Sequence, residues 1–137
     1  MILDVEQQHT DELGHLNHVA AVRLLEQARY AWYRACGLFD PALGRFGTVV
    51  VNIDYDYRRE CFLGERLRIT SRGLSMGTKS MLVGHEIVKP DGQIAIEGRA
   101  TSVVMDLATR RIVPVPTCVA RHLAPRYQPG GVGTISR

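Results

Sequence analysis

Residues 17–37 read NHVAAVRLLEQARYAWYRACG, and this stretch decides the fold class. Asn17 is suited to cap a helix because its side-chain oxygen can accept a hydrogen bond from a first-turn N–H. Gly37 is a natural residue just after a helix C-terminus. Between them, apolar residues recur three and four positions apart, as on a helix with one buried face: Val22, Leu25, Ala28, Trp32 and Ala35. The pattern predicts a helix over about His18–Cys36.

After residue 46 the period changes to two, which is typical of half-buried strands. Pro90-Asp91-Gly92 suits a hairpin loop between two longer runs that we expect to pair antiparallel. The predicted strands are Ile2–His9, Val49–Arg58, Arg66–Thr70, Lys79–Lys89, Gln93–Met105 and Ile112–Val115. One long helix followed by strands predicts an α+β fold, with an antiparallel sheet of five or six strands against the helix.

Length and composition predict one domain. The chain has 137 residues with 45% apolar residues, which is enough for a single core. We expect the domain to span residues 1–125 and residues 126–137, which include Pro129–Gly133, to form a mobile tail. No uncharged apolar run reaches the roughly 20 residues of a membrane span, and the N-terminus has no pattern of an export signal.

Charge and cysteine usage narrow the function classes. The net charge of +3 would favour anionic ligands but is too small to indicate nucleic-acid binding. Cys36, Cys61 and Cys118 lie far apart without a CxxC pair, which fits reduced thiols rather than a disulfide framework or a zinc cluster. We therefore expect a cytoplasmic protein.

The polar segment 9–18, HTDELGHLNH, is the best candidate for chemistry. Gly14 permits a left-handed turn or close approach by a ligand. A helix N-terminus stabilises negative charge, so an oxyanion can bind at the backbone N–H of His18. Asp11 is then placed either to attack a carbonyl or to activate a water.

These residues carry a family resemblance. The run Asp11-x-x-Gly14-His15-Leu16-Asn17-His18, followed by Glu26-x-Ala28-Arg29, resembles the signature of hotdog-fold acyl-CoA thioesterases, specifically the 4-hydroxybenzoyl-CoA thioesterase-like group. Further similarity lies in later segments: Tyr55–Tyr57 with Phe62–Glu65, Gly77–Ser80 and Val113–Pro116. The resemblance covers Val5 to about Pro116. The chain departs from the family pattern at three positions: His18 replaces Asn, Ala21 replaces Tyr and Glu65 replaces Asp.

The resemblance implies a fold, an assembly and an activity. It implies an antiparallel sheet wrapped around one central helix, in a homodimer that can pair into a homotetramer, with the active site at the subunit interface. It also implies hydrolysis of the thioester of an acyl-CoA or of acyl carrier protein, with Asp11 as the catalytic carboxylate and the His18 amide as the oxyanion donor. No cofactor is needed, since coenzyme A is part of the substrate.

Other residues are weaker candidates. His15 can bind the ligand carbonyl or orient Asp11, and the alternative is a packed histidine without a catalytic role. A metal site formed by His9, Asp11, His15 and His18 is disfavoured, because the spacing lacks a helical i, i+4 ligand pair. Glu26 and Arg29 are interpreted as an ion pair on the helix. The remaining substrate-binding candidates are Gly14, Asn17, Arg58, Arg59, Lys79 and Ser80.

Two other functions stay open. An enoyl hydratase or dehydratase of the same fold could use Asp11 and His15, although the proline-containing motifs associated with those enzymes are missing. A non-catalytic acyl-CoA-binding module is the third hypothesis. The sequence leaves four points undecided. These are the length or aromaticity of the acyl group, whether its carrier is coenzyme A or acyl carrier protein, whether Asp11 is a nucleophile or a general base, and whether the assembly is a dimer or a tetramer.

Overall fold

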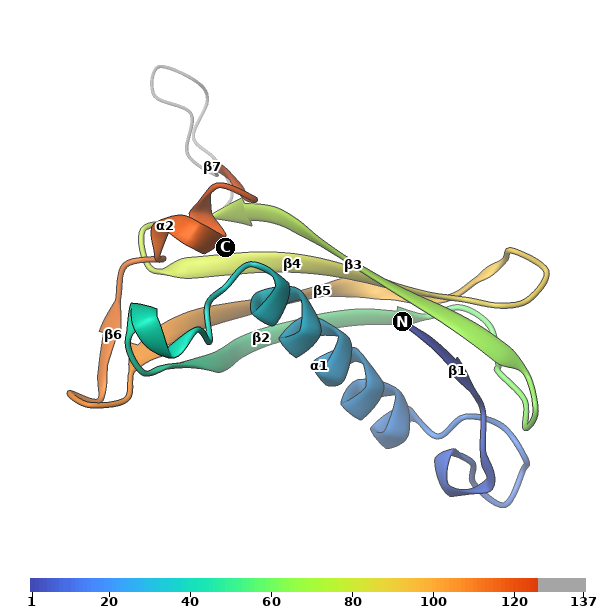
Figure 1. Cartoon of the computed structure of the whole chain (residues 1–137). Coiled ribbons are helices and arrows are strands. Elements are labelled where there is room, and N and C mark those ends of the chain that lie inside the picture. Colours follow the sequence, from blue (N-terminus) through green and yellow to red (C-terminus); the bar gives the residue numbers. More distant parts are fainter. Residues whose placement is uncertain (126–137) are drawn as a thin grey trace. The chain divides into compact units, whose positions relative to one another are not determined.

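A computed structural model describes residues 1–125 of the chain, and the tail predicted for 126–137 lies outside them. The described residues contain one long helix and four long strands, and the strands belong to one sheet (Figure 1). In chain order the elements are β1 (Ile2–Asp4), the 3-10 turn η1 (Gln7–His9), α1 (His18–Ala35), the 3-10 turn η2 (Pro41–Leu43), β2 (Phe46–Tyr57), β3 (Arg66–Met76), β4 (Ser80–Val88), β5 (Ile94–Asp106), β6 (Arg111–Val113), α2 (Thr117–Ala120) and β7 (Ala124–Pro125).

The strands form one sheet in the order β1-β3-β4-β5-β2. β1 pairs antiparallel with β3, and β6 pairs antiparallel with β5. The two-residue β7 pairs parallel with β3. The predicted α+β class and its antiparallel sheet are confirmed, with β6 and β7 as short additions to the main strand order.

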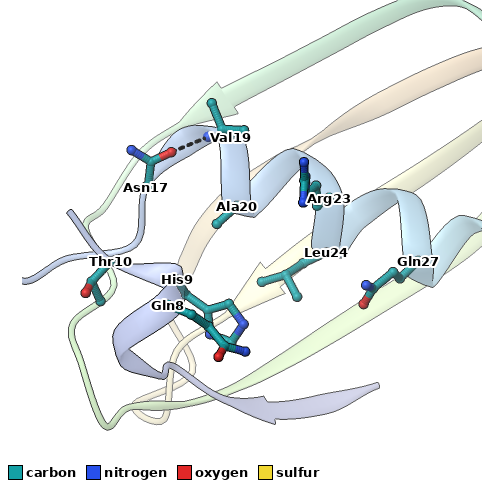
Figure 2. A pocket seen from close by; sticks show the side chains of 9 residues that line it. All are labelled: Gln8, His9, Thr10, Asn17, Val19, Ala20, Arg23, Leu24 and Gln27. Carbon is teal, nitrogen blue, oxygen red and sulfur yellow. Dashed lines mark hydrogen bonds between the residues drawn. The ribbon is translucent and has the colours of Figure 1, made fainter.

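The caps of α1 agree with the sequence. At its start, Asn17 Oδ1 accepts a hydrogen bond of 2.8 Å from the Val19 N–H, drawn as a dashed line in Figure 2. At its end, Gly37 has a φ of +90°, and the N–H groups of Gly37 and Leu38 donate back to the carbonyls of Arg34 and Tyr33. This pair of hydrogen bonds forms a Schellman motif, in which a left-handed glycine ends the helix.

Residues 1–125 divide into two compact units, which are described separately. The first contains Met1–Ala31, Tyr55–Ser71 and His85–Gly98, and the second contains Trp32–Asp54, Arg72–Gly84 and the chain from Arg99. The buried apolar core of the first unit consists of Val5, Ala21, Leu24, Leu25, Ala28, Cys61, Leu67, Ile69, Ile87, Ala95 and Ile96. That of the second consists of Tyr33, Leu38, Met81, Val83, Val104, Val115, Val119 and Leu123.

The β4–β5 hairpin forms as predicted. The Lys89 N–H donates to the Gln93 carbonyl at 2.8 Å, and Gly92 has a φ of +88°. Asp91 Oδ1 accepts from the Gln93 N–H at 2.9 Å, an Asx turn of the kind that favours Asp in such loops. The short Pro-Asp-Gly run therefore places β5 directly beside β4.

Two local predictions were wrong. The first strand ends at Asp4 rather than His9, because the Glu6 N–H donates to His9 Nδ1 and bends residues 7–9 into a 3-10 turn. The predicted Glu26–Arg29 ion pair is also not formed within residues 1–125. The guanidinium of Arg29 is buried and donates to the Tyr55 hydroxyl, while Glu26 is exposed.

The strand predicted from residue 49 is present as β2, and its apolar residues are half exposed. Val49, Val51 and Ile53 keep 40%, 58% and 42% of their surface accessible. β2 ends the strand order, so β5 is its one neighbour in the sheet. An edge strand with exposed apolar side chains is a candidate surface for pairing with another chain.

Candidate active site

The loop between η1 and α1 is folded back on itself by backbone hydrogen bonds. Thr10 and Leu16 form an isolated antiparallel bridge, and the Asp11 N–H donates to the His15 carbonyl at 3.2 Å. Gly14 has a φ of +80°, a conformation that favours glycine, and its N–H donates to the Asp11 carbonyl at 3.0 Å. Gly14 thus has the left-handed turn conformation that the sequence suggested, and its part in substrate binding stays a prediction.

Contacts with the chain after β2 fix this loop. The Leu16 N–H donates to the Cys61 carbonyl at 2.7 Å, and His15 forms an isolated antiparallel bridge with Phe62. The ammonium of Lys89 holds the other side of the 60–65 turn: it donates to the Glu60 carbonyl at 2.5 Å and lies 3.3 Å from Glu65 Oε1. The turn is therefore held by groups far away in sequence.

A cleft of about 340 Å³ lies between this loop, the start of α1 and the end of β2. Small-molecule sites are commonly concave and of roughly this size. The cleft contains five of the predicted site residues. It is lined by Asp11, His15, Leu16, His18, Ala21, Tyr57, Arg58, Arg59, Glu60, Cys61 and Ile96.

One oxygen of the Asp11 carboxylate is anchored and the other faces His15. The Leu13 N–H donates to Asp11 Oδ1 at 2.9 Å, and Oδ2 lies 3.8 Å from His15 Nδ1. The side chain is 31% exposed, so water reaches it. An anchored carboxylate that lines a cleft can act on a molecule bound there.

The His15 ring lies between two carboxylates. Its Nε2 is 3.7 Å from Glu60 Oε1, opposite the Asp11 contact at Nδ1. The edge of the Phe62 ring packs against it, with the ring centroids 6.4 Å apart. Sequence analysis missed Glu60, since nothing in its neighbourhood relates it to position 15 before the fold brings them together.

The start of α1 lines the same cleft. His18 is the first residue of α1, and its N–H has no acceptor among residues 1–125. First-turn N–H groups of a helix carry partial positive charge and bind anions. The Asn17 side chain satisfies the next donor, Val19 N–H, which leaves the His18 N–H available to a ligand.

The two arginines of the cleft differ in their partners. Arg58 is paired, with Nη2 2.9 Å from Glu97 Oε1 and 3.6 Å from Asp56 Oδ2. Arg59 forms no ion pair with any side chain of the described chain. The N–H groups of both arginines donate to the Ala95 carbonyl, which fixes the backbone there. Arg59 is therefore the cation available to an anionic ligand.

Lys79 and Ser80 are not brought into the cleft. Ser80 begins β4 in the second unit, where its carbonyl accepts from the Gly77 N–H at 3.0 Å. Neither residue is among those that line the cleft around Asp11. Their predicted part in substrate binding stays a prediction.

Cys61 forms part of the cleft wall and is buried. Burial raises the pKa of its thiol to about 11. Lys89 lowers this pKa and Glu65 raises it, both by smaller amounts. A thiol with so high a pKa stays protonated near neutral pH and reacts slowly.

Within residues 1–125, no three His, Cys, Asp or Glu side chains form a group that could hold a metal ion. No helix in this range is long and apolar enough to cross a membrane.

A second cleft, of about 460 Å³, lies against η1 and the first turns of α1 (Figure 2). It contains Asn17 and Thr10, the immediate sequence neighbours of His18 and Asp11, but not those two residues. It is lined by Gln8, His9, Thr10, Asn17, Val19, Ala20, Arg23, Leu24 and Gln27. No carboxylate lines it, so the cleft with Asp11 is the candidate active site.

Comparison with known proteins defines the class. The family model described as the thioesterase-like superfamily matches residues 5–123. The chain belongs to this superfamily. The match confirms the resemblance to hotdog-fold thioesterases inferred from the segment between Asp11 and Arg29.

Individual relatives agree with this assignment. The long-chain acyl-CoA thioesterase FadM of Escherichia coli strain K12 is 31% identical over 111 residues, which cover 80% of this chain and 84% of FadM. The crystal structure of the probable thioesterase YbaW from Escherichia coli superposes with a TM-score of 0.75 at 26% identity, over 90% of this chain and 97% of YbaW.

A third similarity concerns the fold alone. The Staphylococcus aureus protein SAV2348, solved in complex with CoA, gives a TM-score of 0.81 at 16% identity, over 93% of this chain and 86% of that protein. Together with YbaW it identifies the antiparallel sheet with one long helix as the hotdog fold.

Proposed function

We propose that this chain is an acyl-CoA thioesterase that hydrolyses its substrate with the Asp11 carboxylate and the N-terminal amide of α1. One observation carries the proposal: Asp11 and His18, whose N–H has no acceptor within residues 1–125, line the same cleft. The activity is supported by membership of the superfamily and by the 31% identity to FadM.

The chemistry follows from this arrangement. The thioester carbonyl oxygen binds at the His18 N–H, where the α1 dipole stabilises the negative charge of the tetrahedral intermediate. Asp11 either attacks the carbonyl carbon or takes a proton from the attacking water. If Asp11 attacks, the C–S bond breaks and leaves the acyl group on Asp11 as a mixed anhydride, which a water then hydrolyses to the free acid. If Asp11 activates a water, the C–S bond breaks and gives the free acid directly. In both routes the sulfur leaves as a thiolate. His15, 3.8 Å from Asp11, orients the carboxylate.

The leaving group is proposed to be coenzyme A or the pantetheine arm of an acyl carrier protein. Arg59 at the cleft is suited to bind a phosphate of that arm, because no acidic side chain of residues 1–125 neutralises it. Coenzyme A is part of the substrate, so the proposed reaction needs no further cofactor.

Replacing Asp11 tests this assignment. We expect Asp11→Asn to lower kcat by about a hundredfold or more, as is typical when a catalytic carboxylate is removed. Thiol release from a panel of acyl-CoA esters measures this. Glu12→Gln is the matched control, because Glu12 is an exposed neighbouring carboxylate outside the cleft. Undiminished turnover by Asp11→Asn would refute the role of Asp11.

Two further measurements, a crotonyl-CoA hydration assay and an acyl-CoA binding assay, separate the alternatives. Crotonyl-CoA converted to a 3-hydroxyacyl product without free thiol would identify a hydratase. Tight binding of acyl-CoA without turnover of any ester would identify a binding module.

We also propose that the chain forms a homodimer through the β2 edge. Val49, Val51 and Ile53 expose an apolar stripe there. Apolar edge strands of this kind are normally covered in the working assembly. Two such dimers can associate further into a tetramer.

Light scattering after size-exclusion chromatography tests the assembly. Val51→Lys places a charge on the stripe, and we expect it to yield a monomer, while Val51→Thr keeps the β-branched shape and should remain dimeric. A wild-type monomer at micromolar concentration would contradict the proposed dimer.

A further inference from the structure

The first unit buries two ionisable side chains deep in its interior. Arg29 of α1 and His85 of β4 keep only 2% and 3% of their surface accessible. Arg29 Nη1 donates to the Tyr55 hydroxyl at 3.2 Å, and the Tyr55 and His85 rings meet edge to face, with centroids 6.4 Å apart. Ser71 Oγ lies 2.9 Å from His85 Nδ1. These four side chains form one polar cluster, here called the Arg29 cluster.

The Arg29 cluster has too few acceptors. A guanidinium carries five N–H donors, yet within residues 1–125 its one side-chain hydrogen bond is to Tyr55, and no acidic side chain pairs with it. His85 Nε2 is also buried without a partner among the described residues. Burying a cation without a counter-ion is strongly unfavourable, so this arrangement favours an anionic group beside it.

The Arg29 cluster lies on the same faces of α1 and β2 as the candidate active site. Residues 18 and 21 of α1 line the cleft, and residue 29 follows at helical spacings that keep it on their side. Along β2, Tyr57 lines the cleft, and Tyr55, two positions away, points to the same face and accepts from Arg29.

The distance between the two sites suits an acyl group. Ala21 and Arg29 are eight residues apart on one helix, a rise of about 12 Å. Long side chains on a helix lean toward its N-terminus, which brings the guanidinium closer to the cleft. The buried core of the first unit contains small side chains at Ala21, Ala28 and Ala95, and also the larger Leu24 and Leu25.

We propose that the Arg29 cluster recognises a carboxylate at the far end of the acyl group, so that the preferred substrates are thioesters of dicarboxylic acids of medium length. The inference rests on the proposed thioesterase function. A carboxylate supplies the missing counter-ion, and it can bind a guanidinium through two parallel hydrogen bonds. His85 Nε2 provides a further contact to the same group.

The wild-type protein alone gives the first test. We would compare kcat/KM for adipoyl-, suberoyl- and sebacoyl-CoA with that for hexanoyl-, octanoyl- and decanoyl-CoA, which have the same lengths but end in a methyl group. For at least one length the carboxylate ester should be hydrolysed about tenfold faster or more, the effect of one charge-assisted hydrogen bond. A third substrate, 6-hydroxyhexanoyl-CoA, separates the effect of charge from that of hydrogen bonding. Its kcat/KM should be lower than that of adipoyl-CoA, because its hydroxyl carries no charge.

Variants then assign the preference to the cluster. Arg29→Met removes the charge and keeps the length of the side chain, and it should abolish the preference for the carboxylate ester while hexanoyl-CoA turnover persists. Arg23→Met is the matched control, because Arg23 is exposed on the same helix and lines the other cleft. Should Arg29→Met not fold, Tyr55→Phe, which removes the hydroxyl beside the guanidinium, should change the ratio of the two rates.

The outcomes are distinct. Equal rates for carboxylate and methyl esters in the wild type, or a preference that survives in Arg29→Met, would overturn this inference and leave the thioesterase function in place. Absence of hydrolysis with every ester would instead count against the thioesterase function itself.

Discussion

The two compact units bury different kinds of polar residue. In the first unit the buried polar side chains are ionisable, Arg29 and His85, and the same unit contains both clefts. In the second they are neutral, Thr101 and Ser102, beside a core with aromatic residues such as Tyr33. Because buried charges cost stability unless a partner compensates them, the first unit carries features that suit a ligand and the second those of a packed core.

The largest effect is expected in the second unit. Tyr33 is fully buried, with Trp32 and Phe39 packed edge to face at centroid distances of 5.6 and 6.3 Å. Tyr33→Ala should lower the free energy of unfolding by about 3–5 kcal/mol, the usual cost of removing a large buried ring. Urea denaturation measures it. Tyr33→Leu, which fills most of the space, should cost clearly less, and equal losses for both would contradict this packing argument.

The buried His85 of the first unit should make the stability of the protein depend on pH. Burial, together with the nearby Arg29, lowers the pKa of His85 from 6.5 to about 4. Between about pH 4 and pH 6.5 His85 is therefore neutral in the folded chain and protonated in the unfolded chain. Its contribution to the free energy of unfolding is complete above about pH 6.5 and is lost as the pH falls toward 4. The loss amounts to at most about 3 kcal/mol.

Unfolding free energies of the wild type and His85→Gln from pH 8 to pH 4 measure this effect. The variant has no titrating group at position 85, so its stability should fall less over that range. Carboxylates titrate in both proteins and cancel in the difference. Two parallel curves would show that His85 is not held neutral by the fold.

The smallest effect is expected at the Asn17 cap, where stability and activity can be separated. Asn17→Ala removes the hydrogen bond to the Val19 N–H and should cost about 1 kcal/mol of stability. Because the neighbouring His18 amide is the proposed oxyanion donor, kcat should fall more than KM changes. Asn17→Ser restores a capping oxygen and should recover both. A loss of stability with unchanged kcat would show that the Asn17 cap does not contribute to catalysis.

Features encoded by neighbouring residues could be predicted from the sequence. The helix from His18, its Asn17 and Gly37 caps and the Pro90–Gly92 hairpin all depend on local hydrogen bonds and backbone preferences. The Asp11 loop was found through its turn glycine and its position before the helix. The family resemblance added the catalytic hypothesis to that position.

Features that depend on distant residues could not be predicted. Glu60 reaches His15 only because the turn after β2 pairs with the Asp11 loop. Arg29 was assigned to Glu26 by its spacing on the helix, while the fold directs it to Tyr55 on β2. The alternating residues of β2 indicated a strand, but its exposed edge depends on the strand order of the whole sheet.

The hydrogen bond from Leu16 to Cys61 has a consequence for how the protein reaches its working form. It joins two segments separated by the whole of α1 and β2, and closing so long a loop costs chain entropy that local helix formation does not. We expect the amide proton of Leu16 to become protected from exchange later during refolding than those in the middle of α1. A newly made chain would then acquire its helix first and its catalytic competence last.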